Sequence, residues 1–228
     1  MQDPNKLRPF FENVEFNREG SNMILNFGPQ HPSAHGQLKL VLEVDGEKII
    51  KARPGIGYMH RGVEKMAENM IYQEFVPVTD RVDYIAAGSN NYGFCATVEK
   101  LCGIDVPRRA QIIRTMLLEL NRIASHLLFL GTHALDIGAM TVFLYTFRER
   151  EYVLDLIEKY SGARLTHHNV KIGGMFVDLP DGWLDELLAF CEKFPRDIAD
   201  YEALLDTNRI WLLRTQNVGV ITKEQALS

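Results

Sequence analysis

The chain has 228 residues, of which 46% are hydrophobic and 24% charged, a balance typical of a globular protein and not of a disordered one. Its net charge of −5 leaves no basic excess to neutralise phosphates, so no nucleic-acid partner is expected. Three scattered cysteines, Cys95, Cys102 and Cys191, favour a reducing compartment over a disulfide framework. The polar, proline-broken start predicts neither a signal peptide nor a transit peptide.

The first third of the chain is predicted to be rich in β-strands. Apolar and alternating runs indicate strands at 23–27, 38–44 and 48–53. Asp45-Gly46, between the last two, is a strong hairpin signal. A turn-rich connection then leads into a short helix that begins at His60.

From about Asp80 the apolar spacing becomes helical, and an acidic residue at 80–83 is suited to cap the first helix. The pattern predicts helices over 80–101, 107–128, 141–160 and 183–205, the last interrupted at Pro195. A turn or strand is expected near 169–176. Thr222 to Gln225 resembles a capping box, yet the chain stops three residues later, which predicts a truncated chain.

The expected fold class is therefore α+β, with N-terminal antiparallel β hairpins followed by a bundle of long helices. The β-rich region is placed at 1–79 and the helical region at 80–228. Both are expected to belong to one domain that continues beyond the end of the chain.

The segment 124–145 contains no Lys, Arg or Glu and could be mistaken for a membrane span. Asp136 near its middle would cost about 3 kcal/mol in lipid, so buried soluble helices with a break at 136–138 are expected instead. A buried carboxylate needs a partner, and a histidine from a neighbouring loop would serve. The alternative is that Asp136 caps the helix that starts near Thr141.

The loop from Asn26 to Gly36 places two histidines, His31 and His35, between prolines that stiffen it. A rigid loop can hold a titratable side chain in place, and histidine has an unperturbed pKa of about 6.5, close to physiological pH. These properties suit proton-coupled chemistry. The alternative is a turn in which both histidines only cap backbone groups.

Several cofactor motifs are missing from the sequence. It has no phosphate-binding Gly-x-x-x-x-Gly-Lys loop, and Gly55-Ile-Gly57 lacks the third glycine of a dinucleotide site. No Cys-x-x-Cys occurs, and three cysteines cannot ligate an iron–sulfur cluster. His31 with His35, or His167 with His168, could form a zinc site, but the spacing does not favour one and no metal is expected. Any redox chemistry would therefore need an electron carrier from a partner or the substrate.

Taken together, the motifs resemble the 49-kDa, hydrogenase-like subunit family of respiratory complex I, known in bacteria as the D subunit. The resemblance covers nearly the whole chain and only the N-terminal part of the family's usual length. The matching segments are Gly28-Pro-Gln-His-Pro-Ser-Ala-His-Gly36, Ile56-Gly-Tyr-Met-His-Arg-Gly-Val-Glu-Lys65, Asp80-Arg-Val-Asp-Tyr84, Val98-Glu-Lys-Leu101, Glu119-Leu-Asn-Arg-Ile-Ala-Ser-His-Leu128, Leu135-Asp-Ile-Gly-Ala139, Phe147-Arg-Glu-Arg-Glu151, Ser161-Gly-Ala-Arg164 and Ile172-Gly-Gly174.

The resemblance implies a fold like that of the nickel–iron hydrogenase large subunit with its metal site lost. It also implies a pocket in which quinone is reduced beside an iron–sulfur cluster held by the B subunit of the complex. His35 is implied to bind the quinone headgroup, with Asp136 linked to it, and His31 lies on the same loop. Arg61 and Arg81 are implied to lie near the cluster, where positive charge stabilises the reduced state.

Two positions depart from the family pattern. The family's second headgroup ligand is a tyrosine four residues before the Val-Glu-Lys-Leu motif, where this chain has Phe94, and Tyr92 is the nearest tyrosine. Tyr92 would substitute through a backbone shift, or His35 would act alone with water, or the site is impaired. Many members also carry a near-cluster histidine at the position of Thr166, and His167 and His168 follow it with no assigned role.

The expected function is that of a peripheral-arm subunit of a proton-translocating NADH:quinone oxidoreductase. It would bind no cofactor by itself, would contact the B, C, I and H subunits, and would reach the membrane only through partners, on the cytoplasmic side of a bacterial inner membrane. One alternative is the same role in a complex fed by ferredoxin or reduced deazaflavin. Another is a non-catalytic scaffold. An active hydrogenase is disfavoured because the first Cys-x-x-Cys pair is absent.

Overall fold

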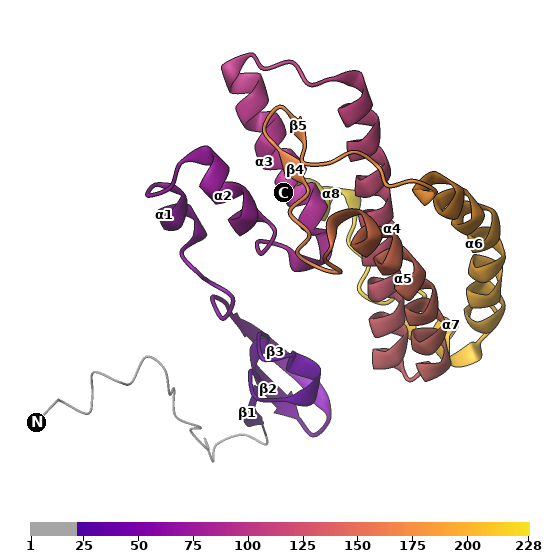
Figure 1. Cartoon of the computed structure of the whole chain (residues 1–228). Coiled ribbons are helices and arrows are strands. Elements are labelled where there is room, and N and C mark those ends of the chain that lie inside the picture. Colours follow the sequence, from indigo (N-terminus) through magenta and orange to yellow (C-terminus); the bar gives the residue numbers. More distant parts are fainter. Residues whose placement is uncertain (1–21) are drawn as a thin grey trace, which may run out of the picture. The chain divides into compact units, whose positions relative to one another are not determined.

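The computed structural model describes residues 22–228, which divide into two compact units, 22–62 and 63–228 (Figure 1). The start of the chain, where neither a signal peptide nor a transit peptide was predicted, lies outside the described residues. Helix α1 (Val63–Ala67) corresponds to the short helix expected from His60, and α2 (Tyr72–Thr79) also begins before residue 80, where the helical region was expected to start. The change to helices therefore occurs at the boundary between the two units.

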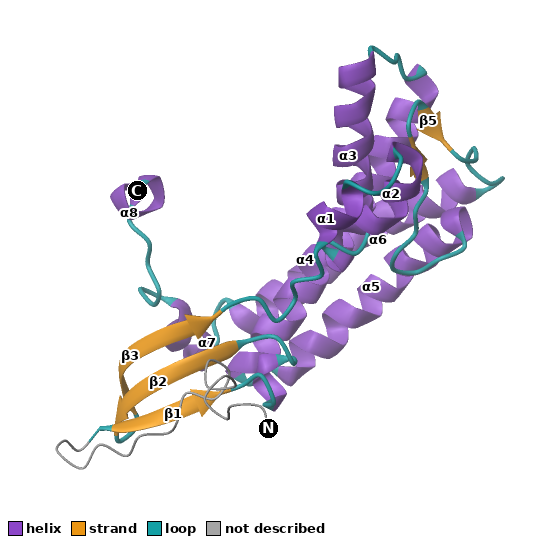
Figure 2. Cartoon of the chain, turned by 90° about the vertical axis from the view of Figure 1, so that its left-hand side faces the viewer, coloured by secondary structure: helices purple, strands orange, loops and turns teal. Residues whose placement is uncertain are grey.

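The first unit is a three-stranded antiparallel sheet in the order β1-β2-β3, drawn in orange in Figure 2. Its strands are β1 (Met23–Phe27), β2 (Lys39–Asp45) and β3 (Lys48–Gly55). Asp45 pairs with Lys48, so the hairpin turn has two residues, and Gly46 adopts the positive φ of 59° that such a turn requires. The predicted strands and hairpin are confirmed.

The helix expected from residue 80 begins later than predicted. A 3₁₀ turn (Tyr84–Ala86) precedes α3 (Ala87–Cys102), and Asp83, not Asp80, caps that turn by accepting a hydrogen bond from the Ile85 N–H at 3.1 Å. Asp80 ends α2 instead and is fully buried. The expected helix start at residue 80 is wrong because the Asp80 side chain bonds elsewhere.

Three long helices form the main core of the second unit, and Figure 1 shows them side by side. They are α4 (Arg108–Ile137), α5 (Met140–Ser161) and α6 (Trp183–Leu205). Apolar side chains from all three meet in one cluster: Ile113, Leu117, Leu120, Ala124, Val153, Leu156, Ile157, Tyr160, Trp183 and Phe190. The predicted break at 136–138 is confirmed, because α4 ends at Ile137 and Gly138 takes a left-handed φ of 102°.

The predicted interruption of the last long helix is wrong. Helix α6 continues through Pro195, which is exposed. Proline removes one helical N–H, here the partner of the Cys191 carbonyl, and Cys191 is also exposed. Water can reach this site, so the missing bond costs less than it would in a core.

Shorter elements complete the second unit. The expected structure near 169–176 is a small hairpin of β4 (Val170–Lys171) and β5 (Gly174–Met175). After α6 comes α7 (Arg209–Thr215), which the sequence pattern did not predict, and then α8 (Lys223–Leu227). The predicted capping box is confirmed, since Thr222 and Gln225 each bond to the other's backbone N–H.

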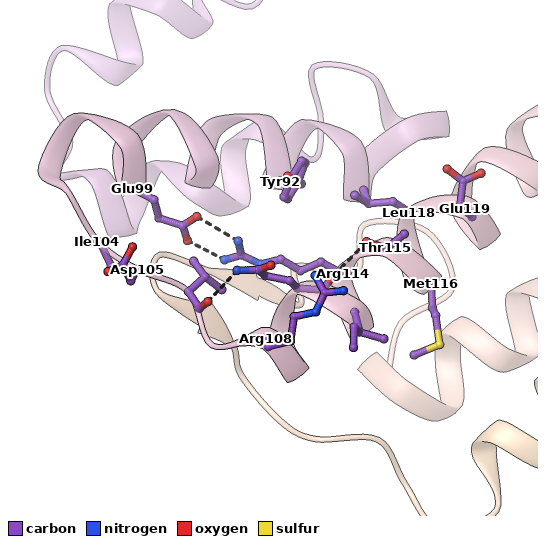
Figure 3. A pocket seen from close by; sticks show the side chains of 13 residues that line it. Tyr92, Glu99, Ile104, Asp105, Arg108, Arg114, Thr115, Met116, Leu118 and Glu119 are labelled. Atoms are coloured by element: carbon purple, nitrogen blue, oxygen red, sulfur yellow. Dashed lines mark hydrogen bonds and ion pairs between the residues drawn. The ribbon is translucent and has the colours of Figure 1, made fainter.

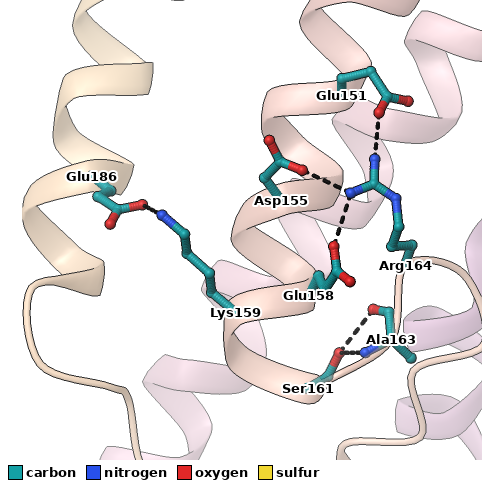
Figure 4. Close-up of polar contacts among 8 residues, drawn as sticks. All are labelled: Glu151, Asp155, Glu158, Lys159, Ser161, Ala163, Arg164 and Glu186. Atoms are coloured by element: carbon teal, nitrogen blue, oxygen red, sulfur yellow. Dashed lines mark hydrogen bonds and ion pairs between the residues drawn. The ribbon is translucent and has the colours of Figure 1, made fainter.

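The segment after α5 is held to that helix by Arg164. Figure 4 shows its guanidinium among three carboxylates of α5, with Asp155 at 2.7 Å, Glu158 at 2.9 Å and Glu151 completing the set. Gly162 ends α5 with a left-handed φ of 78°. These contacts direct the chain after Ser161 towards the hairpin β4–β5. None of the helices in residues 22–228 has the length and apolar composition needed to cross a bilayer.

Candidate functional site

The two loop histidines have different roles in the structure. The loop contains a short 3₁₀ helix (Pro32–Ala34), and His31 caps it by accepting the Ser33 N–H on Nδ1 at 3.1 Å. The His31 ring also packs against Phe27, with ring centroids 4.2 Å apart. His31 therefore caps a backbone group, as one of the two interpretations of the loop predicted, and its Nδ1 lone pair is occupied by the Ser33 N–H.

His35 is different, because it ends the 3₁₀ helix in the left-handed conformation, with φ 51°. Its side chain is exposed and makes no hydrogen bond to any other described residue. A non-glycine residue with positive φ is uncommon and is often found at functional positions. Both nitrogens of His35 are thus available to a ligand or to a partner group.

Gly28 holds the two ends of this loop together. A Cβ at that position would lie 2.0 Å from the carbonyl oxygen of Leu38, and Gly28 has a positive φ of 72°. Only glycine permits both features. The close approach sets the path of the histidine loop between β1 and β2.

Asp136 lies in the last turn of α4 and is exposed, so the expectation of a buried charge is wrong. Ala139, and not Asp136, is the N-cap of α5, which also rules out the capping role. The Asp136 side chain forms no hydrogen bond or ion pair with the other residues of the described range. A carboxylate at a helix C-terminus is disfavoured by the helix dipole, so helix stability does not explain it. His35 and Asp136 belong to different units, and their pairing remains a prediction.

Tyr92 and Phe94 point away from each other on α3. Tyr92 lies beneath the guanidinium of Arg114, whose carbon is 5.7 Å from the ring centroid. Phe94 packs against α2, with its ring centroid 5.2 Å from that of Phe75 and 6.3 Å from that of Tyr72. Residues two apart on a helix differ by about 200° in direction, so the two rings cannot share one position.

Tyr92 lines a cavity of about 630 Å³ between α3 and α4 (Figure 3). Its wall also carries Glu99 and Arg114, together with the exposed charged residues Arg108 and Glu119. Neither Phe94 nor Asp136 takes part in it. Charged, polar and apolar side chains all line this cavity, and Tyr92 is the single aromatic residue among them.

The two arginines expected near a cluster are both exposed. Arg61 lies in the connection after β3, at the end of the first unit. Arg81 follows α2 in the second unit, and its guanidinium donates to the carbonyl of Pro77. Burial raises the pKa of Asp80, an effect that the positive charge of Arg81 only partly offsets, whereas burial and the Arg81 charge both lower the pKa of His168.

The sequence pattern did not reveal a buried polar group around Asp80, and it left His167 and His168 without a role. Asp80 accepts the backbone N–H of His168 at 3.2 Å. Burial raises the pKa of Asp80 to about 6, and burial lowers the pKa of His167 to about 4. The signal in the sequence was the pair of adjacent histidines, but nothing there connected them to Asp80.

The alternative of a zinc site at His167 and His168 would need further metal-ligating side chains around them, and the described residues supply no such cluster. No three metal-ligating side chains of the His, Cys, Asp or Glu type gather anywhere in 22–228.

Comparison with known proteins places these motifs in one family. The family model described as "Respiratory-chain NADH dehydrogenase, 49 Kd subunit" matches residues 136–228. Over 227 residues the chain is 74% identical to the D subunit of the NADH-quinone oxidoreductase of Campylobacter concisus. Over 228 residues it is 72% identical to that of Campylobacter jejuni and 63% identical to that of Wolinella succinogenes. Each comparison covers 100% of this chain and 56% of the relative, so the chain spans about half the length of these relatives.

Proposed function

We propose that this chain forms part of the quinone-reduction pocket of complex I. The chain belongs to the family of the 49 kDa subunit of respiratory-chain NADH dehydrogenase, whose bacterial members are named the D subunit of NADH-quinone oxidoreductase. In this proposal it is a peripheral subunit that contacts the B, C, I and H subunits on the cytoplasmic side of the membrane. The electrons reach the quinone from an iron–sulfur cluster held by the B subunit.

Reduction of a quinone to a quinol takes up two electrons and two protons, and this chain would serve the proton side of the reaction. His35 is the proposed donor because its ring is exposed, stands at a fixed left-handed position and is committed to no other described residue. Histidine suits proton transfer near neutral pH. This free imidazole on a rigid loop is the observation that carries the proposal.

The other residues have supporting roles in the same proposal. Asp136 is an exposed carboxylate, unpaired within the described range and available to hold the imidazole and to stabilise its protonated form. His31 fixes the loop as its 3₁₀ cap and is proposed to contact the quinone beside His35. Phe94 offers an apolar ring surface, whereas Tyr92 faces the separate cavity between α3 and α4. Arg61 and Arg81 are exposed cations available to a neighbouring cluster.

The test is inhibitor-sensitive quinone reduction in membranes that carry His35→Ala in the full-length protein, normalised to assembled complex. We expect a loss of turnover with assembly intact. His126→Ala is the matched control, because His126 is also exposed but lies on α4. Turnover equal to wild type in His35→Ala would contradict the proposal and favour a scaffold role. Running the wild type with NADH and with reduced ferredoxin identifies the electron donor.

A further inference from the structure

We propose that the side of α6 turned away from α5 binds an amphipathic helix of another subunit of the complex, one whose apolar residues are flanked by lysine or arginine. This surface lies entirely in the second unit, and none of its residues is among those assigned to the quinone pocket. Its apolar residues, which we call the α6 stripe, are Leu184, Leu188, Cys191, Pro195 and Ile198.

The α6 stripe is exposed although it is apolar. Leu188 is 60% exposed, Leu184 46% and Ile198 38%. Cys191 and Pro195 are exposed as well. The five residues follow one another at intervals of four, three, four and three, so they form a single line along the helix, about 21 Å long. An apolar line with this spacing is the surface against which a second helix packs.

Packing within the second unit does not account for the α6 stripe. At about 100° per residue, the stripe lies about 90° round the helix from the residues that face the core, Trp183, Leu187, Phe190 and Phe194. On the flank opposite the stripe, Lys193 pairs with Glu149 of α5 at 2.9 Å. Figure 1 shows α5 beside α6 in the second unit. A helix that covers one core needs an apolar arc of about 100°, whereas the core side and the stripe together span about 180°.

The charges next to the α6 stripe indicate the chemistry of the partner. Asp185 and Glu192 lie along the edge of the stripe that is farther from the core, and neither forms an ion pair within residues 22–228. Asp185 also suits the first turn of α6, but Glu192 lies mid-helix, where the helix dipole gives no such support. Pro195 leaves the Cys191 carbonyl without its helical donor, which adds an acceptor for a basic side chain. These acceptors select a helix with lysine or arginine beside its apolar line.

A helix of another subunit fits this surface better than the two other possible occupants. The relatives are each named as one subunit of an oxidoreductase, so other subunits are available as partners. A second copy of this chain would bring the same acidic edge, and like charges across a contact disfavour it. A later part of the same polypeptide would be brought to the surface by chain connectivity and would need no charge pattern to be selected.

The natural thiol of Cys191 reports whether the α6 stripe is covered. In the purified complex assembled with the full-length protein, we expect a maleimide to label Cys191 at least about ten-fold more slowly than the thiol of Ala189→Cys, because interface cores are packed like protein interiors. Ala189 is exposed on the α5 side of the same helix and is the matched position. Labelling of both thiols at the same rate would overturn the proposal.

Charge reversal tests the chemistry of the partner. Glu192→Lys places a positive charge against the basic partner, so labelling of Cys191 in the complex should become about five-fold faster than in the wild type. Asp200→Lys is the matched control, since Asp200 is exposed on the α5 side of α6, and it should leave the labelling rate unchanged. Equal labelling rates in the two variants would contradict an acidic edge that selects a basic helix.

Crosslinking with a carbodiimide identifies the occupant, because this reagent joins a carboxylate to a lysine amine that pairs with it. We expect mass spectrometry of the crosslinked complex to find Glu192 or Asp185 joined to a lysine in an amphipathic helix of another subunit. Glu192→Gln should remove the links made by Glu192. Links only to a second copy of this chain, or to a later part of the same polypeptide, would overturn the proposal. Quinone turnover in His35→Ala is measured separately, so a failure here leaves the proposed function untouched.

Discussion

Arg114 of α4 and Glu99 of α3 form a two-point ion pair in which both side chains are more than nine-tenths buried. The guanidinium donates to the two carboxylate oxygens at 3.0 and 2.6 Å, and it also donates to the carbonyls of Lys171 and Gly174. Burial acts to raise the pKa of Glu99, but the hydrogen bonds from Arg114 and from the Gly173 N–H hold it below its ordinary value. The pair therefore joins α3, α4 and the hairpin β4–β5.

Replacing Glu99 by Gln should destabilise the protein strongly. The change leaves the Arg114 charge buried without its counter-ion, a situation that costs about 3–5 kcal/mol. The matched control is Asp178→Asn, because the Arg109–Asp178 pair is also an arginine–carboxylate contact, at 2.8 Å, but both side chains are more than half exposed. Its loss should be below about 1 kcal/mol. Urea unfolding of the full-length protein checks both values, and equal losses would contradict a special role for the buried pair.

Asp80 and His167 should make opposite contributions to the pH dependence of stability. Burial raises the Asp80 pKa from 3.8 to about 6, so the folded state holds that proton more tightly, and stability from this group falls as the pH rises through 4 to 6. Burial lowers the His167 pKa from 6.5 to about 4, so the unfolded state binds more protons there and stability rises over nearly the same range.

Single variants should uncover the two opposing slopes. Asp80→Asn removes the falling contribution, so the free energy of unfolding should rise with pH between about 4 and 6.5 more steeply than in the wild type. His167→Gln should show the reverse, a steeper fall. The measurement is urea unfolding at half-unit pH steps, with the exposed Asp181→Asn as control. Parallel curves for all variants would show that neither buried group titrates in this range.

Asp136→Asn should leave stability nearly unchanged and alter the pH profile of quinone reduction. Asp136 is exposed, has no partner among the described residues and sits at the negative end of the α4 dipole. Removing its charge should change the free energy of unfolding by less than about 1 kcal/mol, in the stabilising direction. Unfolding and turnover between pH 6 and 8 are measured in parallel. A large loss of stability would assign Asp136 a structural role instead.

Gly131→Ala should have opposite effects in two backgrounds. A Cβ at Gly131 would lie 2.4 Å from Oγ1 of Thr146, which is fully buried where α4 meets α5. In the wild type we expect a net loss of up to about 2 kcal/mol from overpacking. In a Thr146→Ala background the obstructing hydroxyl is gone, and alanine should instead add up to about 1 kcal/mol through helix propensity. If the effects of Gly131→Ala and Thr146→Ala were simply additive in a double-mutant cycle, the two helices would move apart to accommodate the added methyl group and the prediction would be wrong.

Patterns that depend on near neighbours in the chain were readable from the sequence. The turn at Asp45-Gly46, the helix start at Pro107 and the break at Gly138 all appear where the pattern predicted them. Each depends on backbone properties of the residue itself, such as a positive φ or a missing N–H. Pro195 misled the prediction because its exposure, which makes a helical proline tolerable, is not visible in the sequence.

The candidate site was readable only in part. The sequence singled out His35, Asp136 and Phe94, but it could not tell that His31 is used as a cap while His35 is free of contacts within the described range. It expected Asp136 to be buried because the neighbouring residues are apolar, yet the last turn of α4 leaves it exposed. The packing of Phe94 against Phe75 gave no signal, since the two residues lie on different helices.

By itself, the sequence determined the order of the strands and of the long helices, the family and the residue types available for proton chemistry, because these follow from local spacing and motifs. The tertiary structure alone decided which side chains are free, paired or buried. Asp80 meets His168 and Glu99 meets Arg114 only because packed helices bring distant parts of the chain together. Burial and pairing set the protonation of such groups, and both are properties of the packed fold.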